Sequence, residues 1–179
     1  QRILSDGRRQ ITRFSLPGET FGTYKLREPA ALESLVALEP VTYCPAPEAD
    51  PHSALDRAFK SQQIEFRARA IGNITRLGRM NARERLYDLL LELVERLQLA
   101  GFVATRGFAI PLTQECLADA LGLTPVHVNR TLQACRAAGD LSWTGGRVEI
   151  FEGGEMARRM WWRDVQPGAF MLRPNNAGS

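Results

Sequence analysis

The stretch IPLTQECLADALGLTPVHVNRTLQAC, residues 110–135, decides the fold of this chain. Thr113 stands where a first short helix would begin, and Gly122 supplies the turn that ends it, because glycine adopts left-handed backbone without strain. Thr124 followed by Pro125 is typical of the start of a second helix, since threonine caps the first turn and proline fits within it. The spacing therefore predicts a helix-turn-helix.

Apolar residues in this stretch recur at helical spacing and predict one buried face on each helix. The expected inward residues are Cys116, Leu117, Ala120 and Leu121 in the first helix and Val128, Leu132 and Cys135 in the second. The outer face of the second helix then carries Val126, His127, Asn129, Arg130 and Gln133 near its start. In a helix-turn-helix that binds DNA, residues at these places meet base edges.

A predicted hairpin follows the second helix. Residues 141–144 and 147–150 alternate in polarity around Gly145-Gly146, which is a typical two-residue turn between antiparallel strands. Such a hairpin would form the wing of a winged helix-turn-helix. The small Ala118 beside the turn supports the same interpretation. The alternatives are an ordinary helical hairpin with a β ribbon, or a winged helix used for protein contacts.

The middle of the chain predicts a long helix with two apolar edges. The first edge repeats at steps of four and three, the spacing of a coiled-coil seam, through Phe59, Gln63, Phe66, Ala70, Asn73, Leu77 and Met80. The second edge is formed by Ile64, Ile71 and Ile74. We interpret the first edge as a dimer interface; a core helix within one subunit is the alternative.

A helix restart is predicted at Asn81, with Glu84 placed three residues later to complete a capping box. Leucines and Val94 form an apolar stripe after it, and the helix should end near Gly101. We place a domain boundary at Asn81.

Residues 1–44 have the pattern of short strands. A hairpin is expected at Asp6-Gly7, a further strand over residues 34–44, and a break at the proline-rich residues 45–51, whose last proline suits the first turn of a helix. This β piece is too short to close a barrel or sandwich, so we expect that preceding strands are missing from the sequence.

Composition narrows the class of protein. The 179 residues are 44% hydrophobic, which fits a globular chain, and the net charge of +3 gives mild support for an anionic partner. Cys44, Cys116 and Cys135 lack metal-ligand spacing, and His52 and His127 belong to no catalytic pattern. We therefore predict no enzyme, no metal and no evident cofactor. No apolar run is long enough to cross a bilayer, and we expect a cytoplasmic protein without membrane contact.

With these motifs in place, the chain resembles the Crp/Fnr superfamily of transcription regulators, the family of the cyclic AMP receptor protein. Residues 16–22, LPGETFG, resemble part of its effector-domain β-roll, residues 59–80 its dimer helix, and residues 110–150 its winged helix-turn-helix. The tail from Phe151 onward is not covered, and Trp161-Trp162 there suggests a helix that packs on the domain.

The resemblance implies roles for individual residues. Arg130 matches the guanine-contacting arginine of the family, while Asn129 and Val126 suit an adenine and a thymine methyl group. The candidate phosphate contacts are Gln114, Thr124, His127 and Arg147, and Thr113 and Gln133 complete the expected DNA-binding set.

The same resemblance argues against cyclic AMP as the effector. Members that bind it use an Arg-Ser pair to neutralise the phosphate, and Glu33-Ser34 stands in that place here. A carboxylate there would repel the phosphate. The oxygen-sensing branch uses an amino-terminal cysteine cluster that this sequence does not contain. The effector, the target genes and the direction of regulation are not encoded in any recognisable motif.

We thus predict an α+β protein with a partial, cupin-like β-roll sensor domain over residues 1–54 and a dimerisation helix over 55–80. The winged helix-turn-helix domain spans 81–160 and a tail spans 161–179. The predicted function is a homodimeric transcription regulator that binds a palindromic double-stranded DNA site, with RNA polymerase as a further partner. The alternative is a dimeric ligand-sensing or interaction protein whose winged helix does not contact DNA.

Overall fold

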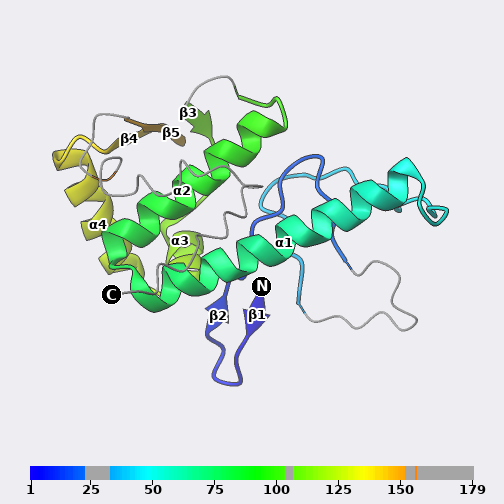
Figure 1. Cartoon of the computed structure of the whole chain (residues 1–179). Coiled ribbons are helices and arrows are strands. Elements are labelled where there is room, and N and C mark those ends of the chain that lie inside the picture. The colour runs from blue at the N-terminus through cyan, green and yellow to red at the C-terminus, as the bar shows by residue number, and fades with distance from the viewer. Residues whose placement is uncertain (23–32, 104–106, 152–155, 157–179) are drawn as a thin grey trace, which may run out of the picture.

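The computed structural model describes residues 1–22, 33–103, 107–151 and 156. In chain order its elements are β1 (Arg2–Ile3), β2 (Arg9–Gln10), α1 (Ala54–Arg79), α2 (Ala82–Leu99), β3 (Gly107–Ala109), α3 (Gln114–Leu121), α4 (Pro125–Ala137), β4 (Leu141–Thr144) and β5 (Arg147–Ile150). The α+β class is confirmed. Figure 1 shows α1 as a long rod, with the other helices gathered toward its carboxyl-terminal end. The predicted tail helix at Trp161-Trp162 lies outside the described residues.

Helices α1 and α2 are separate because the backbone between them is extended. Met80 (φ −89°, ψ 146°) ends α1, and Asn81 (φ −74°, ψ 170°) caps α2. The predicted capping box is confirmed, since the Asn81 side chain accepts from the Glu84 amide while Glu84 accepts from the Asn81 amide. Helix α1 begins at Ala54 rather than at Pro51, because the Ser53 hydroxyl supplies the cap by accepting from the Asp56 amide.

The helix-turn-helix forms as predicted. The Thr113 hydroxyl caps α3 by accepting from the Cys116 amide at 3.1 Å. Gly122 ends α3 in the left-handed conformation (φ 63°, ψ 40°), which an L side chain adopts only with strain. The Thr124 hydroxyl caps α4 by accepting from the His127 amide at 3.2 Å, and Pro125 occupies the first turn.

The wing is one hairpin of a three-stranded antiparallel sheet in the order β3-β5-β4. Gly145 and Gly146, with φ of 58° and 76°, form the predicted turn between β4 and β5. Strand β3 was not predicted, because it is only three residues long and its pairing partner β5 lies some 40 positions later in the chain. The Arg147 guanidinium also joins these strands by donating to the Gly107 carbonyl at 3.2 Å.

The amino-terminal segment forms less β structure than predicted. The hairpin around Asp6-Gly7 is present as β1 and β2, paired antiparallel. The strand predicted over residues 34–44 is wrong, because these residues have no regular structure and belong to neither sheet of the described part of the chain, although Ser34 exchanges backbone hydrogen bonds with Gln1. Strand-forming side chains there, such as Val41 (61% exposed) and Tyr43 (73% exposed), have no sheet face to pack against.

One hydrophobic core holds α2, α3, α4 and the wing together. Its largest fully buried side chains include Tyr87, Leu90, Phe108, Leu121 and Val148. Ile11 also belongs to this core, so the amino-terminal segment packs against the carboxyl-terminal half of the chain. None of the described helices is long and apolar enough to cross a membrane.

A buried arginine joins α1 to α2. The Arg76 side chain is 5% exposed, and it donates to the carboxylates of Asp88 and Glu92, each at 2.6 Å. A buried charge is stable only when it is paired and hydrogen-bonded. These two ion pairs therefore restrict the angle at which α2 leaves α1.

The same network continues into the amino-terminal segment. Glu92 also pairs with Arg96, which in turn pairs with Glu19 at 2.7 Å and donates to the Phe14 carbonyl at 2.6 Å. Arg69 of α1 pairs with Glu19 as well. One chain of charges thus connects the predicted sensor segment with both α1 and α2.

Replacing Arg76 with methionine is expected to lower the free energy of unfolding by about 3 to 5 kcal/mol, because Asp88 and Glu92 then lose the buried guanidinium that bonds to both carboxylates. Urea denaturation followed by circular dichroism measures this loss. The matched control is Arg79→Met, which removes an exposed arginine from the same helix and should change stability by less than about 0.5 kcal/mol. Equal effects of the two variants would contradict a structural role for the Arg76 cluster.

Candidate nucleic-acid interface

The outer face of α4 carries a stripe of side chains suited to contact with another molecule. Val126 is 64% exposed, Arg130 and Gln133 are exposed, and Asn129 is half-buried. These positions follow the i, i+3, i+4, i+7 spacing of one helix face. We call these four residues the α4 stripe. The opposite face packs into the core through Val128, Thr131, Leu132 and Cys135.

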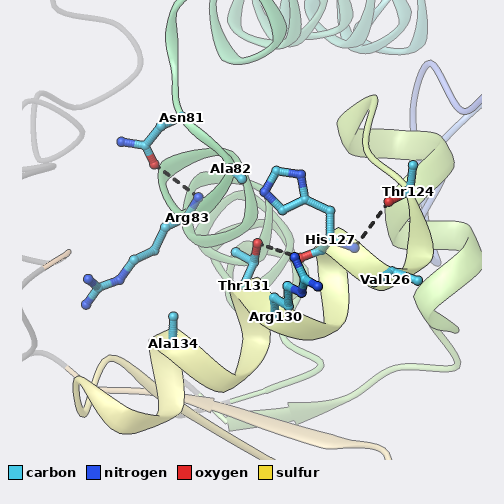
Figure 2. Close-up of a pocket in the computed structure, with 9 residues that line it drawn as sticks. All are labelled: Asn81, Ala82, Arg83, Thr124, Val126, His127, Arg130, Thr131 and Ala134. Atoms are coloured by element: carbon cyan, nitrogen blue, oxygen red, sulfur yellow. Dashed lines mark hydrogen bonds between the residues drawn. The ribbon is translucent and has the colours of Figure 1, made fainter.

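Two shallow concavities flank this stripe. The first lies between α4 and the start of α2, and Figure 2 shows its lining residues Asn81, Ala82, Arg83, Thr124, Val126, His127, Arg130, Thr131 and Ala134. The second lies beside the start of α3 and is lined by Gln114, Pro125, Val126, Asn129, Arg130 and Gln133. Val126 and Arg130 line both, so they form the ridge between the two concavities.

The charge of this surface favours an anionic partner. Helix α4 contains no acidic residue, and the Arg130 side chain makes no hydrogen bond or ion pair with any other residue that the structure describes. An exposed guanidinium offers a planar fork of donors that suits guanine or phosphate. The acidic Asp119 of the neighbouring α3 is paired with Arg9 at 2.5 Å, which lowers its effect on an approaching anion.

Three nearby arginines have partners within the chain. Arg83 pairs with the fully buried Asp140 at 2.6 Å, Arg136 donates to the Trp143 carbonyl at 2.7 Å, and Arg147 donates to Gly107. Sequence reasoning did not identify Arg83 as part of this surface. Its place in the first turn after the Asn81 cap was visible, but only the packing of α2 against α4 brings it to the concavity.

The predicted DNA-binding residues lie in four places. Gln114 and the α4 stripe meet at the second concavity, and His127 and Thr124 line the first. Thr113 is exposed at the start of α3, where its hydroxyl serves as a cap. Arg147 lies on the wing, outside the lining of both concavities.

The residues predicted as a dimer seam are partly covered by their own chain, although Phe66 remains 39% exposed. Phe59 is buried, the Asn73 amide donates to the Thr12 carbonyl, and Arg13 lies 4.6 Å from the centre of the Phe66 ring. Leu77 and Met80 are half-buried, and Met80 packs against the hydrophobic core. Gln63 is half-buried, while Ala70 is exposed.

The second edge of α1 is the exposed one. Ile64, Ile71 and Ile74 are 67%, 66% and 71% exposed. At 100° per residue these three side chains lie within one third of the helix circumference, opposite the face that carries Arg76. Three large exposed isoleucines on one helix face are typical of a surface that binds another protein.

Comparisons with known proteins identify the same domain. Residues 84–158 match the family model of the Crp-like helix-turn-helix domain. The nitrogen fixation regulation protein FixK of Azorhizobium caulinodans is 29% identical over 89% of this chain and 66% of its own length. The transcriptional regulatory protein btr of Bordetella pertussis is 35% identical over 70% of this chain and 54% of its own.

Two further relatives extend the likeness. The anaerobic regulatory protein of Pasteurella multocida is 30% identical over 83% of this chain and 56% of its own length. The solved structure of FixK2 from Bradyrhizobium japonicum superimposes with a TM-score of 0.60 and 25% identity, covering 83% of this chain and 75% of that one. The chain therefore spans 54% to 66% of the length of these three curated relatives.

The packing of the inner face of α4 can be tested through the reactivity of the Cys135 thiol. Burial, reinforced by the nearby Asp140 carboxylate, raises the pKa of the Cys135 thiol to about 11, so it stays protonated and unreactive near neutral pH. Cys44 is exposed and Cys116 half-buried. With Ellman's reagent at pH 8 we expect Cys44 to react first and Cys135 only after denaturation.

The Cys44→Ser variant provides the control, because it should remove the fast phase and leave the slow one. A fast phase that survives Cys44→Ser and disappears in Cys135→Ala would show that α4 does not pack as described.

Proposed function

We propose that this chain, whose residues 84–158 match the Crp-like helix-turn-helix domain and which is homologous to Crp/Fnr transcription regulators, binds a palindromic DNA site as a homodimer. One observation carries this proposal: the exposed α4 stripe. It lies on a helix whose start is capped by Thr124, and the start of the neighbouring α3 is capped by Thr113. In a helix-turn-helix, the second helix lies in the major groove and contacts the base edges with its exposed side chains, as the Arg130 side chain on this amphipathic helix could do.

The stripe supports a definite pattern of base contacts. Arg130 is proposed to contact guanine, because its two parallel donors match guanine O6 and N7. Asn129 is proposed to contact adenine, and the exposed methyl groups of Val126 a thymine methyl. Three positions spread over one face of α4 match about three successive base pairs of a half-site.

Phosphate contacts are proposed on both sides of the stripe. Gln114 and Thr124 stand at the starts of α3 and α4, where helix amide groups favour an anion. His127 lines the first concavity, and Arg147 is exposed on the wing, so both are placed to meet the backbone next to the bases. Thr113 is proposed to meet a phosphate at the start of α3.

The proposed dimer contact is centred on the isoleucine edge of α1. Ile64 and Ile71 are seven residues apart and Ile74 follows three later, which is the heptad spacing of two helices packed side by side. The predicted seam from Phe59 to Met80 contributes at its margin, through Phe66 and Ala70. A dimer of this kind places its two α4 helices about one turn of DNA, roughly 34 Å, apart.

The amino-terminal segment is proposed to act as the sensor. It contacts α1 and α2 through Glu19, and α3 through Arg9. Glu33 lies 3.7 Å from Arg13, and a carboxylate at this position disfavours a cyclic nucleotide phosphate. The effector belongs to another chemical class, the protein works in the cytoplasm, and RNA polymerase is the expected protein partner.

A binding-site selection with the purified protein and random duplex DNA tests the function directly. Recovery of a two-fold symmetric site, with affinity that falls as salt rises, is the expected result. Recovery of no common sequence would favour a protein whose winged helix serves only protein contacts.

Replacing Arg130 with alanine should cost about 1 to 3 kcal/mol of binding per half-site and relax the preference at one base. Arg147→Ala is the matched control, since the loss of a phosphate contact weakens binding to all sequences alike. Competition between sites with and without the guanine measures the ratio of the two binding affinities. If Arg130→Ala leaves that ratio unchanged, the arginine contacts only phosphate.

Replacing Ile71 with glutamate should convert the dimer to a monomer, because the change buries a charge in an apolar contact. Analytical ultracentrifugation measures the assembly state. Ala58→Glu adds the same charge at an exposed position on the other side of α1 and should leave the dimer intact. A dimer that persists in Ile71→Glu but is lost in Phe66→Glu would assign the contact to the other edge.

A further inference from the structure

Two amide side chains of the α4 stripe are bonded to each other. The Gln133 Nε2 donates to the Asn129 Oδ1 at 3.0 Å, across one turn of the helix. Both residues line the second concavity beside Arg130, and Gln133 is the more exposed of the two. The pair therefore lies within the surface that the proposed function assigns to bases.

The bond matters because an asparagine amide has two orientations. One presents a carbonyl oxygen and the other an amino group at the same place, and the two orientations have opposite hydrogen-bonding character. A free asparagine on an exposed helix exchanges between them. In the structure the amino group of Gln133 donates to the Asn129 oxygen and holds it on the Gln133 side, so Asn129 keeps this orientation for as long as Gln133 presents its amino group.

The selected orientation complements adenine. Asn129 Oδ1 keeps a second lone pair, and Asn129 Nδ2 makes no hydrogen bond with any described residue. An acceptor and a donor thus stand side by side in a fixed order. Adenine offers the matching N6 donor and N7 acceptor in the major groove, whereas guanine offers two acceptors there and cytosine a single donor.

We propose that Gln133 is a positioning residue for base recognition: it fixes the amide of Asn129, so that the pair sets the preference for adenine at one position of each half-site. This inference rests on the proposed function. A purely structural role is the competing explanation, because amide pairs at this spacing also stabilise a helix slightly. That role predicts a change in stability without any change in base preference.

The experiment measures base preference at one position. Asn129→Ala identifies the position, which is the base pair of the selected site where the preference disappears. Duplexes carrying each of the four base pairs there are then compared by competition for wild type, Gln133→Ala and Gln133→Glu. Gln98→Ala, at an exposed position of α2 away from the stripe, is the control and should change neither affinity nor preference.

Wild type should favour adenine over other bases by roughly 5- to 150-fold. Gln133→Ala should lower this ratio several-fold at that position. The guanine ratio, which is the affinity for a site with guanine at the base pair contacted by Arg130 divided by the affinity for a site without it, should stay unchanged. Gln133→Glu cannot donate, so Asn129 should turn its amino group toward the carboxylate and the preference should move from adenine toward cytosine, which offers a donor.

Two results would overturn the inference. One is an adenine ratio within twofold of wild type in both Gln133 variants, and the other is an Asn129→Ala variant that loses preference at no position. The guanine ratio separates these results from a failure of the proposed function. If wild type shows no guanine preference and no sequence selectivity at all, the function itself is wrong, whereas an intact guanine ratio confines the failure to the Asn129–Gln133 pair.

Discussion

The buried guanidinium of Arg76 is the constraint on which the arrangement of this protein depends. A charge that is almost fully removed from water must keep its partners, and those partners, Asp88 and Glu92, belong to the next helix. Helix α1 and the helix-turn-helix domain are therefore joined by paired charges as well as by the extended residues Met80 and Asn81. Any movement that opens the angle between α1 and α2 must expose or unpair this cluster.

Glu19 extends this constraint to the amino-terminal segment. It pairs with Arg69 of α1 and Arg96 of α2, while Ile11 enters the core and Arg9 pairs with Asp119 of α3. The segment proposed to sense the effector thus contacts α1, α2 and α3, and the last two of these pack against α4. A shift of this segment would reach the proposed DNA-binding surface through charges and packing that are already in place.

The position of the outer face of α4 depends on the packing of its inner face. Arg85 donates to the carbonyls of Met80 and Leu121, and Arg83 binds the buried Asp140 beside the wing. These contacts hold α3 and α4 against the start of α2. Because the inner face is packed, the backbone of α4 holds the outer stripe in a defined place, and the bond between Gln133 and Asn129 joins two of its side chains.

By itself, the sequence determined the local structure of the carboxyl-terminal half. Caps at Thr113, Thr124 and Asn81, the glycines of the turns and the 3.6-residue apolar period act over a few residues, so the helices, the turn and the wing were predictable. The exposed residues of α4 followed from the same period, which is why the stripe was identified in advance.

The features that depend on distant partners were decided only by the tertiary structure. Residues 34–44 have strand-forming side chains but no strand, because a strand needs a neighbour to satisfy its backbone. Both apolar edges of α1 were visible, yet the packing of residues 12–20 on one of them left the isoleucine edge exposed. The ion pairs of Arg76 and Arg83 join residues 12 and 57 positions apart, and no local pattern predicts such a pairing.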